Sequence, residues 1–513
     1  MAAPTAWARR SATLLSSLQV STQNPFRGDR LRFATVGIER GRRGALLRFR
    51  LDRRAAVALE VMETGQGVAS ERNVGTGEAN LYGQTATYDP GDQTLAWTPP
   101  RSLPARTYIL RLTADDGRTT KSENAVVRVL GVDAAFVAPS CLPGSVQELV
   151  IQTDARHLSL VILRCGPETV PTYANNLLNG IPVTAGRPLD WMTQRNAPAA
   201  VYVPIGNWPS GIYAARLQAS DGRLGFAPVV VAPAAPTHRV AVITPALTWQ
   251  AYNFYDADGD GWGDTWYSRW ATSTVDLRRP HANRGVPYRF RSYELAFHHW
   301  LAQRGIDVDV YADVDLERFT SPDQLRAAYD LLVFPGHTEY VTTAIYDLVS
   351  GFRDRGGNLM FLSANNFFRR VDRDAHDVRL IDEWRNLGRP ESDLCGVQYI
   401  ASDRGQRHGP FVVSGADQAP WAFAGTGLQN GSTFGSYGIE IDARAPQSPP
   451  NTTVLASIPN LFGPGRTGEM TYYEHTSGAR VFSAGALNFG GQVLLWPQTT
   501  QLLDNIWQRL TTG

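Results

Sequence analysis

The stretch "DLLVFPGHTEY" (residues 330–340) joins a short apolar run to a polar, turn-forming end. Its large apolar residues, Leu331 to Phe334, indicate a strand that is buried on both faces, as in a parallel sheet. His337 and Glu339 stand two residues apart directly after this strand, so both side chains can serve one site from a loop. A structural alternative stays open, in which Glu339 begins a helix and His337 caps a turn.

Strands of the same kind alternate with helical segments on both sides of this stretch. "RVAVITPA" (239–246) and "NLMFLSANN" (358–366) are predicted strands, and "RSYELAFHHWLAQRG" (291–305) has helical spacing and ends in glycine. Further elements are predicted at 306–316 (strand), 321–329 (helix), 339–357 (helix), 479–487 (strand) and 499–512 (helix). This alternation predicts a mainly parallel α/β sheet with crossover helices.

Polar clusters follow three of the predicted strands. "LTWQAYN" (247–253) follows the first of them, "GHTEY" (336–340) follows the second, and "SANN" (363–366) ends the third. Because ligands of such sheets gather at the carboxyl ends of strands, the three clusters predict one common site.

The residues before 236 predict β-structure only. Short strands alternate with turn residues, and the phrase "ARTYILRLTADDGR" (105–118) is weakly repeated as "SGIYAARLQASDGR" (210–223). A Pro/Ala-rich linker, "VAPAAPTH" (231–238), precedes the change of pattern. The predicted organisation is an N-terminal extension (1–27), two immunoglobulin-like β-sandwiches (28–133 and 134–235) and an α/β domain (236–513).

An acidic loop follows the first polar cluster. In "YDADGDGWGDTWYSRW" (255–270), aspartates occupy positions 1, 3, 5 and 9 of an EF-hand-type calcium loop, namely Asp256, Asp258, Asp260 and Asp264. Position 12, where a glutamate is expected, is Tyr267. The spacing favours Ca²⁺, and an acidic surface turn is the alternative. The loop is also crowded with tyrosine and tryptophan, which suggests a lined pocket.

Composition and net charge limit the kinds of partner that are expected for this chain. The chain has 513 residues, a net charge of +1 and 43% hydrophobic residues. This charge gives no reason to expect nucleic acid, and no apolar run has the length of about 18 residues that a membrane span needs. The N-terminal segment has a basic pair without the apolar core of a signal peptide, so the compartment stays open between cytoplasm and export. Cys141 and Cys165 are either buried thiols or a pair.

Several of these stretches, taken in order, resemble the catalytic domain of the N,N-dimethylformamidase large (beta) subunit family over about residues 238–510. They are "TWQAYN" (248–253), "WYSRW" (266–270), "LRRP" (277–280), "FPGHTEY" (334–340), "FLSANNFF" (361–368) and "EMTYYEHTSGARVFSAGAL" (469–487). The resemblance implies a glutamine-amidotransferase-like α/β fold and an amide hydrolase that holds one iron through two tyrosines and a glutamate. It also implies a small companion subunit or a homo-oligomer.

Residue by residue, the resemblance matches Tyr252 to the first iron-binding tyrosine and Glu339 to the glutamate. Tyr267 is the better match for the second tyrosine, and Tyr255 is the alternative. The loop between the tyrosines carries the "DADGDG" insert and departs in length from the family. Two phenolates and a carboxylate are hard oxygen donors, which suit Fe(III).

The remaining active-site matches are His337, Asn365 and Glu474. Here His337 would move the proton, Asn365 would donate to the developing oxyanion, and Glu474 would orient water or protonate the leaving amine. The substrate implied is a small or N-substituted amide.

Two other functions compete with this one. A non-catalytic surface or carbohydrate-binding protein would use the loop aromatics to stack on sugars. A cysteine hydrolase would need a nucleophile at a strand end, and Cys395 lies in a loop segment instead.

Overall fold

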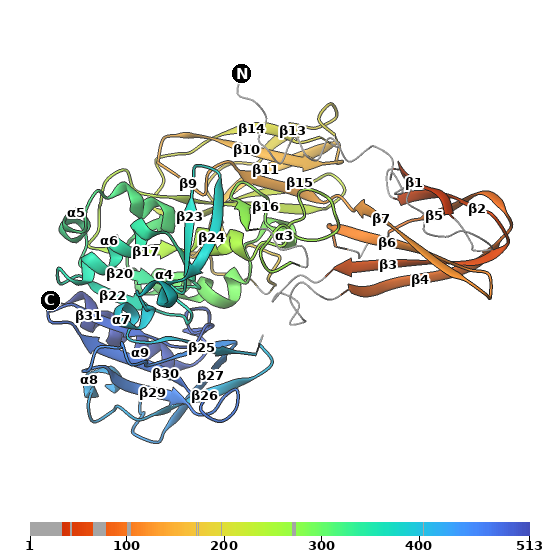
Figure 1. Cartoon of the computed structure of the whole chain (residues 1–513). Coiled ribbons are helices and arrows are strands. Elements are labelled where there is room, and N and C mark those ends of the chain that lie inside the picture. Colours follow the sequence, from red (N-terminus) through yellow and green to blue (C-terminus); the bar gives the residue numbers. More distant parts are fainter. Residues whose placement is uncertain are drawn as a thin grey trace.

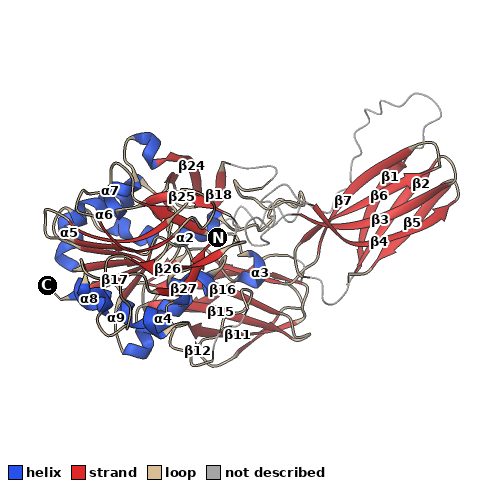
Figure 2. Ribbon diagram, turned by 90° about the horizontal axis from the view of Figure 1, so that it is seen from below, coloured by secondary structure: helices blue, strands red, loops and turns tan. Residues whose placement is uncertain are grey.

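The computed structural model describes residues 33–41, 44–64, 78–99, 104–170, 172, 174–195, 197–268, 273–403 and 405–512. The predicted N-terminal extension (1–27) lies outside them. The described chain is a multidomain arrangement of several β-sheets with few helices (Figure 1). Strands β1 to β7 stand apart from the rest of the molecule at one end (Figure 2).

The first region is a sandwich of two antiparallel sheets, ordered β1-β2-β5 and β4-β3-β6-β7. Its strands are β1 (Phe33–Gly41), β2 (Gly44–Leu51), β3 (Ala55–Thr64), β4 (Glu78–Tyr88), β5 (Gly91–Trp97), β6 (Thr107–Asp115) and β7 (Thr120–Arg128). Alternate residues of both sheets, such as Phe49 and Leu110, share one core. The Tyr108 hydroxyl donates to the carbonyl of Pro104 at 2.7 Å, a tyrosine corner typical of immunoglobulin-like sandwiches.

The second region repeats this design with sheets ordered β14-β10-β8 and β12-β11-β15-β16-β9. Its strands are β8 (Val132–Phe136), β9 (Ser140–Cys141), β10 (Val146–Thr153), β11 (His157–Arg164), β12 (Ile181–Pro182), β13 (Arg187–Asp190), β14 (Ala199–Pro204), β15 (Gly211–Ala219) and β16 (Leu224–Val231). Here the Tyr213 hydroxyl donates to the carbonyl of Pro209 at 2.8 Å. The weak sequence repeat therefore places a tyrosine corner in each sandwich.

The third region is built on a nine-stranded sheet ordered β19-β17-β20-β22-β31-β30-β29-β26-β27 within the described residues. Its strands are β17 (Val240–Thr244), β19 (Asp309–Ala312), β20 (Leu331–Phe334), β22 (Asn358–Phe361), β26 (His408–Val413), β27 (Thr433–Gly438), β29 (Thr453–Ile458), β30 (Gly468–Glu474) and β31 (Arg480–Ser483). Smaller sheets are formed by β18 (Thr274–Asp276), β21 (Tyr340–Val341), β23 (Arg369–Arg373), β24 (Asp377–Glu383), β25 (Gln398–Ser402) and β28 (Glu440–Ala443).

The expectation of a mainly parallel sheet is wrong for this large sheet as a whole. The strands from β19 to β31 pair in parallel. The strands from β31 to β27 pair antiparallel. The predicted alternation with helices covers only the parallel half. Between α7 (Glu391–Cys395) and β31 the strands follow one another with only the short α8 (Pro420–Phe423) between them, so hairpin-like antiparallel pairing replaces crossovers.

Helices cover both faces of the parallel half. The helical segments are α2 (Ala246–Ala251), α3 (Ala282–Gly285), η2 (Arg291–Leu295), α4 (Ala296–Arg304), η3 (Asp313–Arg318), α5 (Pro322–Ala328), α6 (Thr343–Arg353), η4 (Trp384–Leu387), α7 (Glu391–Cys395), α8 (Pro420–Phe423), η5 (Gly490–Gln492) and α9 (Pro497–Thr511). Val333 packs on the side of α4 and α9, whereas Leu332 and Phe334 pack on the side of α5 and α6. This two-sided burial explains why the strand is apolar throughout.

One helix begins later than the sequence predicts. α6 begins at Thr343 and not at Glu339, because the Thr342 side chain caps it by accepting from the Ile345 amide at 3.2 Å. Tyr340 belongs to β21. His337 and Glu339 therefore do not stand at a helix N-terminus, which leaves them available for a site.

None of the helices in the described part of the chain has the length and apolar character needed to cross a bilayer. Cys141, Cys165 and Cys395, all of which are described, are buried free thiols.

Candidate metal and catalytic site

Three adjacent strands of the parallel half end at the same edge of the sheet, and predicted site residues follow each one. α2 follows β17 and ends at Tyr252. The turn after β20 carries His337 and Glu339, and Asn365 comes shortly after β22. None of these four residues is more than 5% exposed. The structure brings them together because the carboxyl ends of neighbouring parallel strands share an edge.

Two tyrosine hydroxyls and one carboxylate gather at the centre of this site. The Tyr252 hydroxyl donates to Glu339 Oε2 at 2.6 Å. The Tyr267 hydroxyl donates to the Tyr252 hydroxyl at 3.0 Å and to Glu339 Oε1 at 3.4 Å. The Tyr252 and Tyr267 rings stack with their centroids 4.5 Å apart. Tyr340, which the sequence did not single out, hydrogen-bonds to Tyr267 through its hydroxyl.

The loop between the two tyrosines is closed at its neck, which returns Tyr267 to the sheet edge. The Thr265 hydroxyl donates to the last carbonyl of α2 at 2.5 Å. The guanidinium of Arg279, in "LRRP", donates to the carbonyls of Gln250 at 2.9 Å and Asp264 at 2.5 Å. These bonds join the two ends of the loop. Tyr252 and Tyr267 therefore meet although they are fifteen residues apart in the sequence.

Tyr255 points away from the site. Its hydroxyl donates to Asp133 Oδ2 at 3.2 Å, and the guanidinium carbon of Arg128 lies 4.3 Å from its ring centroid. Arg128 ends β7 of the first sandwich, and Asp133 belongs to β8 of the second. Tyr255 therefore contacts both sandwiches, and Tyr267 is the one of the two tyrosines whose hydroxyl lies beside Tyr252 and Glu339.

The tip of the loop docks on the first sandwich. The Thr64 hydroxyl donates to the Gly261 carbonyl at 2.7 Å, and Trp262 packs with Met62 and Ile109. Gly261 has a φ of +96°, and a Cβ there would lie 2.8 Å from Ile109 Cγ1. Only glycine fits this position, because both the conformation and the close approach exclude a side chain.

The acidic residues of the loop form a compact group. One carboxylate oxygen each from Asp256, Asp258 and Asp260 lies within 4.8 Å of the others. Burial raises the pKa of Asp256 to about 7 and the pKa of Asp260 to about 6. Asp264 Oδ2 instead accepts from the Ala257 amide at 2.7 Å, and among the described residues it is not part of this group.

A second set of acids lies beside His337. His337 Nε2 is 3.3 Å from Glu339 Oε2 and 3.6 Å from Glu440 Oε2. Asn365 Nδ2 donates to Glu440 Oε2 at 2.8 Å, and the Asn365 amide donates to Asp442 Oδ1 at 2.8 Å. Sequence reasoning missed Glu440 and Asp442. They alternate with apolar residues in "YGIEIDA" (437–443), a pattern that normally indicates a strand with one solvent-facing side.

Glu474 does not join these residues, so the expectation that it orients water or protonates the leaving amine is wrong. It ends β30, which runs antiparallel to β31, and it pairs with Arg480 at the beginning of β31. That is the amino-terminal edge of the parallel strands, opposite the site. Glu474 accepts from the Tyr472 hydroxyl and from Arg509 Nη2, both at 2.7 Å, and its side chain is 49% exposed. The glutamate that does lie beside His337 and Asn365 is Glu440.

Burial governs the protonation of these groups. Burial and the charge of Glu339 raise the pKa of Tyr252 and of Tyr267 above the usual range. Burial also raises the pKa of Glu440 to about 7. Burial lowers the pKa of His337, but its contacts with Glu339 and Glu440 offset this effect, so the net pKa is raised. Protonated phenols beside a carboxylate need a cation before they ionise.

The donor set fits a hard, highly charged metal ion. Tyr252, Tyr267 and Glu339 offer oxygen atoms only, 2.6 to 3.4 Å from one another. Asn365 adds a strained backbone, with a φ of +56°, and its Oδ1 is buried without a hydrogen-bond partner among the residues that the structure describes. Strain and unsatisfied polar atoms of this kind are typical of functional sites.

The two competing functions rest on the loop aromatics and on Cys395. Trp262 is 4% exposed, so it has no free face to stack on a sugar, whereas Trp266 and Tyr267 are half-buried. Trp270 lies outside the described residues. Cys395 is 2% exposed, and burial raises the pKa of its thiol well above the usual range, which opposes a reactive thiolate.

A family model described as "N,N-dimethylformamidase beta subunit-like, C-terminal" matches residues 190–500. The N,N-dimethylformamidase beta subunits of Paracoccus aminophilus and of an Alcaligenes species are 28% and 26% identical to this chain over 189 residues. Those alignments cover 37% of this chain and 24% of each relative, so the chain matches about a quarter of their length.

Among solved structures, elastase-activated alpha-2-macroglobulin of Escherichia coli is 12% identical over 41% of this chain and 22% of that chain, with a TM-score of 0.21. A TM-score of this size does not bear on the fold.

Proposed function

This chain belongs to the N,N-dimethylformamidase beta subunit-like family, and on that premise we propose that it is a metal-dependent hydrolase of small or N-substituted amides. The observation that carries the proposal is the buried cluster of Tyr252, Tyr267 and Glu339 at the strand ends, next to His337. A glutamine-amidotransferase-like third domain and two immunoglobulin-like sandwiches are part of the proposal. A small companion subunit is part of it too, since the relatives are named as beta subunits.

Tyr252, Tyr267 and Glu339 would hold ferric iron. When bound, the iron supplies a Lewis acid that lowers the pKa of water and polarises the amide carbonyl. The two tyrosines would bind it as phenolates, whose charge together with that of Glu339 would balance the cation. Closure of the loop neck by Arg279 keeps Tyr267 against the cluster.

The neighbouring residues supply proton transfer and polar stabilisation. His337 takes the proton of the attacking water at Nε2 and delivers it to the leaving amine. Glu440, 3.6 Å away, stabilises the imidazolium that forms. Asn365 Nδ2 gives one hydrogen to Glu440 and has a second one for the developing oxyanion.

Purified protein from iron-replete medium is expected to contain about one iron per chain and to be coloured, because phenolate bound to Fe(III) absorbs visible light. It is expected to hydrolyse at least one amide in a panel of formamides and N-alkyl amides. Metal analysis, the visible spectrum and amine release are the measurements. Colourless, iron-free protein without hydrolysis, alone and with a candidate small subunit, would contradict the proposal.

We also propose Ca²⁺ at Asp256, Asp258 and Asp260, whose carboxylate oxygens cluster within 4.8 Å. The Tyr267 hydroxyl, at position 12 of the loop, contacts Tyr252 and Glu339. In this proposal one loop contributes to two metal sites. Its acidic turn binds calcium and docks on the first sandwich. Its end places Tyr267 at the iron site.

Calcium is expected to raise the melting temperature of the wild type, because a ligand that binds only the folded state stabilises it by about 3 kcal/mol at a hundredfold excess over Kd. Asp258→Asn should remove this response, since Asp258 is exposed and its loss leaves no cavity. The exposed Asp417→Asn, on another segment, is the matched control. If the wild type melts identically in calcium and in EDTA, the loop does not bind calcium and is only an acidic turn.

A further inference from the structure

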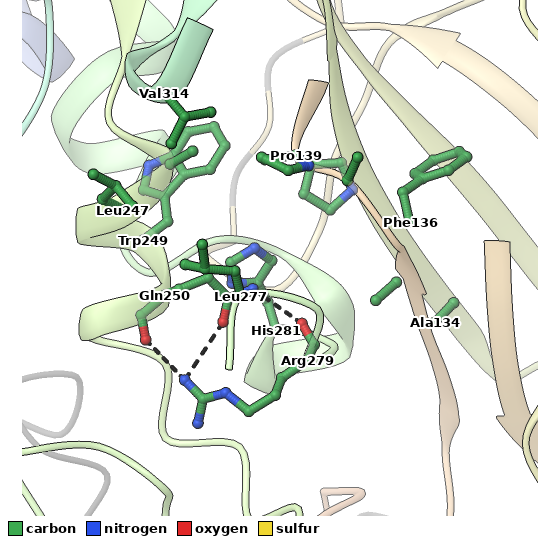
Figure 3. A pocket seen from close by; sticks show the side chains of 14 residues that line it. Ala134, Phe136, Pro139, Leu247, Trp249, Gln250, Leu277, Arg279, His281 and Val314 are labelled. Atoms are coloured by element: carbon green, nitrogen blue, oxygen red, sulfur yellow. Dashed lines mark hydrogen bonds between the residues drawn. The ribbon is translucent and has the colours of Figure 1, made fainter. Parts of the chain in front are cut away.

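Two backbone segments of the proposed site are each held by one buried polar side chain. Arg279 holds the first of them through the carbonyls of Gln250 and Asp264, and Figure 3 shows its guanidinium beside Gln250. Asp442, which is 2% exposed, holds the second segment, which carries Asn365. The Asn365 amide donates to Asp442 Oδ1 at 2.8 Å and to Asp442 Oδ2 at 3.0 Å.

Asn365 needs such a partner because its backbone is strained. Its φ is +56°, in the left-handed region that residues other than glycine rarely adopt. A strained conformation of this kind persists only where neighbouring groups fix it. Phe367, with a φ of +57°, shares the turn and donates its amide to the Thr338 carbonyl at 2.7 Å. The turn after β22 is therefore held at both of these residues, by Thr338 at one and by Asp442 at the other.

One strand presents two acceptors to Asn365. Glu440 and Asp442 stand two residues apart in β28, so their side chains point to the same side of the strand. Glu440 Oε2 accepts from Asn365 Nδ2 at 2.8 Å, whereas Asp442 accepts from the backbone amide. The segment after β31 supports this strand. The Leu487 amide donates to the Glu440 carbonyl, and the Asp442 amide donates to the Gly485 carbonyl, both at 3.1 Å.

The contacts with β28 leave two bonding positions of the Asn365 carboxamide open. Nδ2 has a second hydrogen, and Oδ1 is buried without a hydrogen-bond partner among the residues that the structure describes. Glu440 Oε2 also lies 3.6 Å from His337 Nε2, so the carboxamide lies close to the proposed general base. A buried polar atom without a partner is typical of a functional site. The open positions are those that the reacting amide or its attacking water can use.

We propose that Asp442 is a positioning residue of this hydrolase. It holds Asn365 in the left-handed conformation from which the carboxamide reaches the developing oxyanion, and it acts on the reaction only through Asn365. This inference rests on the proposed function and adds the residue that sets the direction of its oxyanion donor. Asp442 is not among the proposed iron ligands, so its loss should lower turnover without loss of the metal.

Asp442→Ala tests this inference. With N-methylformamide as substrate, kcat and kcat/KM are expected to fall equally, by on the order of 10- to 100-fold, because a misplacement of about 1 Å at the reacting centre costs up to about 100-fold. The iron content and the visible absorption band should stay as in the wild type. Asp442→Asn keeps one acceptor oxygen, so its rate should lie between those of the wild type and the alanine variant.

A double-mutant cycle shows whether Asp442 acts through Asn365. Asn365→Gly removes the carboxamide and adopts a positive φ without strain, so this variant no longer needs the contact with Asp442. Asp442→Ala should therefore lower the rate of the wild type but not the rate of Asn365→Gly. Asp374→Ala is the matched control and should keep the wild-type rate. Asp374 Oδ1 accepts from the amides of His376 and Asp377, both at 2.8 Å, in an exposed turn between β23 and β24.

Hydrogen exchange of the peptide that carries Asn365, followed by mass spectrometry, measures the contact without any turnover. Exchange is expected to be faster in Asp442→Ala than in the wild type and unchanged in Asp374→Ala. If the wild type hydrolyses none of the amides, the proposed function fails, and faster exchange still supports Asp442 as the residue that holds Asn365.

Two results overturn the inference. One is unchanged exchange in a folded Asp442→Ala protein. The other is an equal loss of rate when Asp442→Ala is introduced into the wild type and into Asn365→Gly. If the alanine variant does not fold, Asp442→Asn takes its place, and wild-type exchange together with a wild-type rate then overturns the inference.

Discussion

Glu339→Gln is expected to abolish iron binding and amide hydrolysis together. Glu339 is 2% exposed and contacts both Tyr252 and Tyr267, so it is the one carboxylate that the two phenols share. Loss of an outer partner of a metal ligand already costs about 10- to 100-fold in affinity. Loss of a direct ligand should exceed that, and the iron content, the colour and the rate should fall in parallel.

Glu474→Gln is the matched control for this experiment. Glu474 is the glutamate that the family resemblance matched to a proton-transfer or water-orienting role, and it lies half exposed at the opposite edge of the sheet. We expect it to retain iron, colour and wild-type activity. Full iron content in Glu339→Gln, or a colourless Glu474→Gln protein, would contradict the site described here.

His337→Ala is expected to retain iron and colour while it loses about 10²- to 10⁴-fold in kcat, the usual contribution of a general acid–base. His337 stands beside Glu339 and Glu440, at 3.3 and 3.6 Å, but the phenols and Glu339 form the proposed donor set without it. This variant should therefore keep the metal content and the visible absorption band of the wild type while its turnover falls.

Removal of His337 also takes away a side chain 3.6 Å from the buried Glu440 carboxyl, so a melting curve must accompany the kinetics. His475→Ala, at the same edge as Glu474, is the control and should behave like the wild type. A wild-type rate in a folded His337→Ala protein would transfer the proton-transfer role to Glu440, whose buried carboxyl has a pKa raised to about 7.

Much of the fold follows from local patterns. Apolar runs such as Leu331 to Phe334 indicated the buried parallel strands, and β20 lies between β17 and β22 as their common burial requires. Polar residues at the ends of these strands indicated the site, because strand direction alone brings them to one edge. Tyr252, His337, Glu339 and Asn365 were predicted in this way, with the family resemblance giving their roles.

The antiparallel half of the sheet escaped this reasoning, and so did the second acid group. A glutamate at a strand position carries no mark of the edge at which it lies. Glu440 and Glu474 look alike in sequence, but Glu440 begins β28 beside Asn365, whereas Glu474 ends β30 at the far edge of the parallel strands. Only the pairing of strands distant in sequence decides between them.

The choice of the second tyrosine shows the same division between local pattern and long-range contact. The family resemblance offered both Tyr255 and Tyr267 as the second tyrosine, and an EF-hand-type count marked Tyr267 as the residue that replaces a calcium ligand. The tertiary structure sends Tyr255 to Asp133 and returns Tyr267 to Glu339. Composition and periodicity establish which segments form strands, helices and acidic turns, because those depend on neighbours along the chain. The neck held by Arg279, the docking of Gly261 on the first sandwich and the contact between Asp442 and Asn365 depend on residues that meet only after folding.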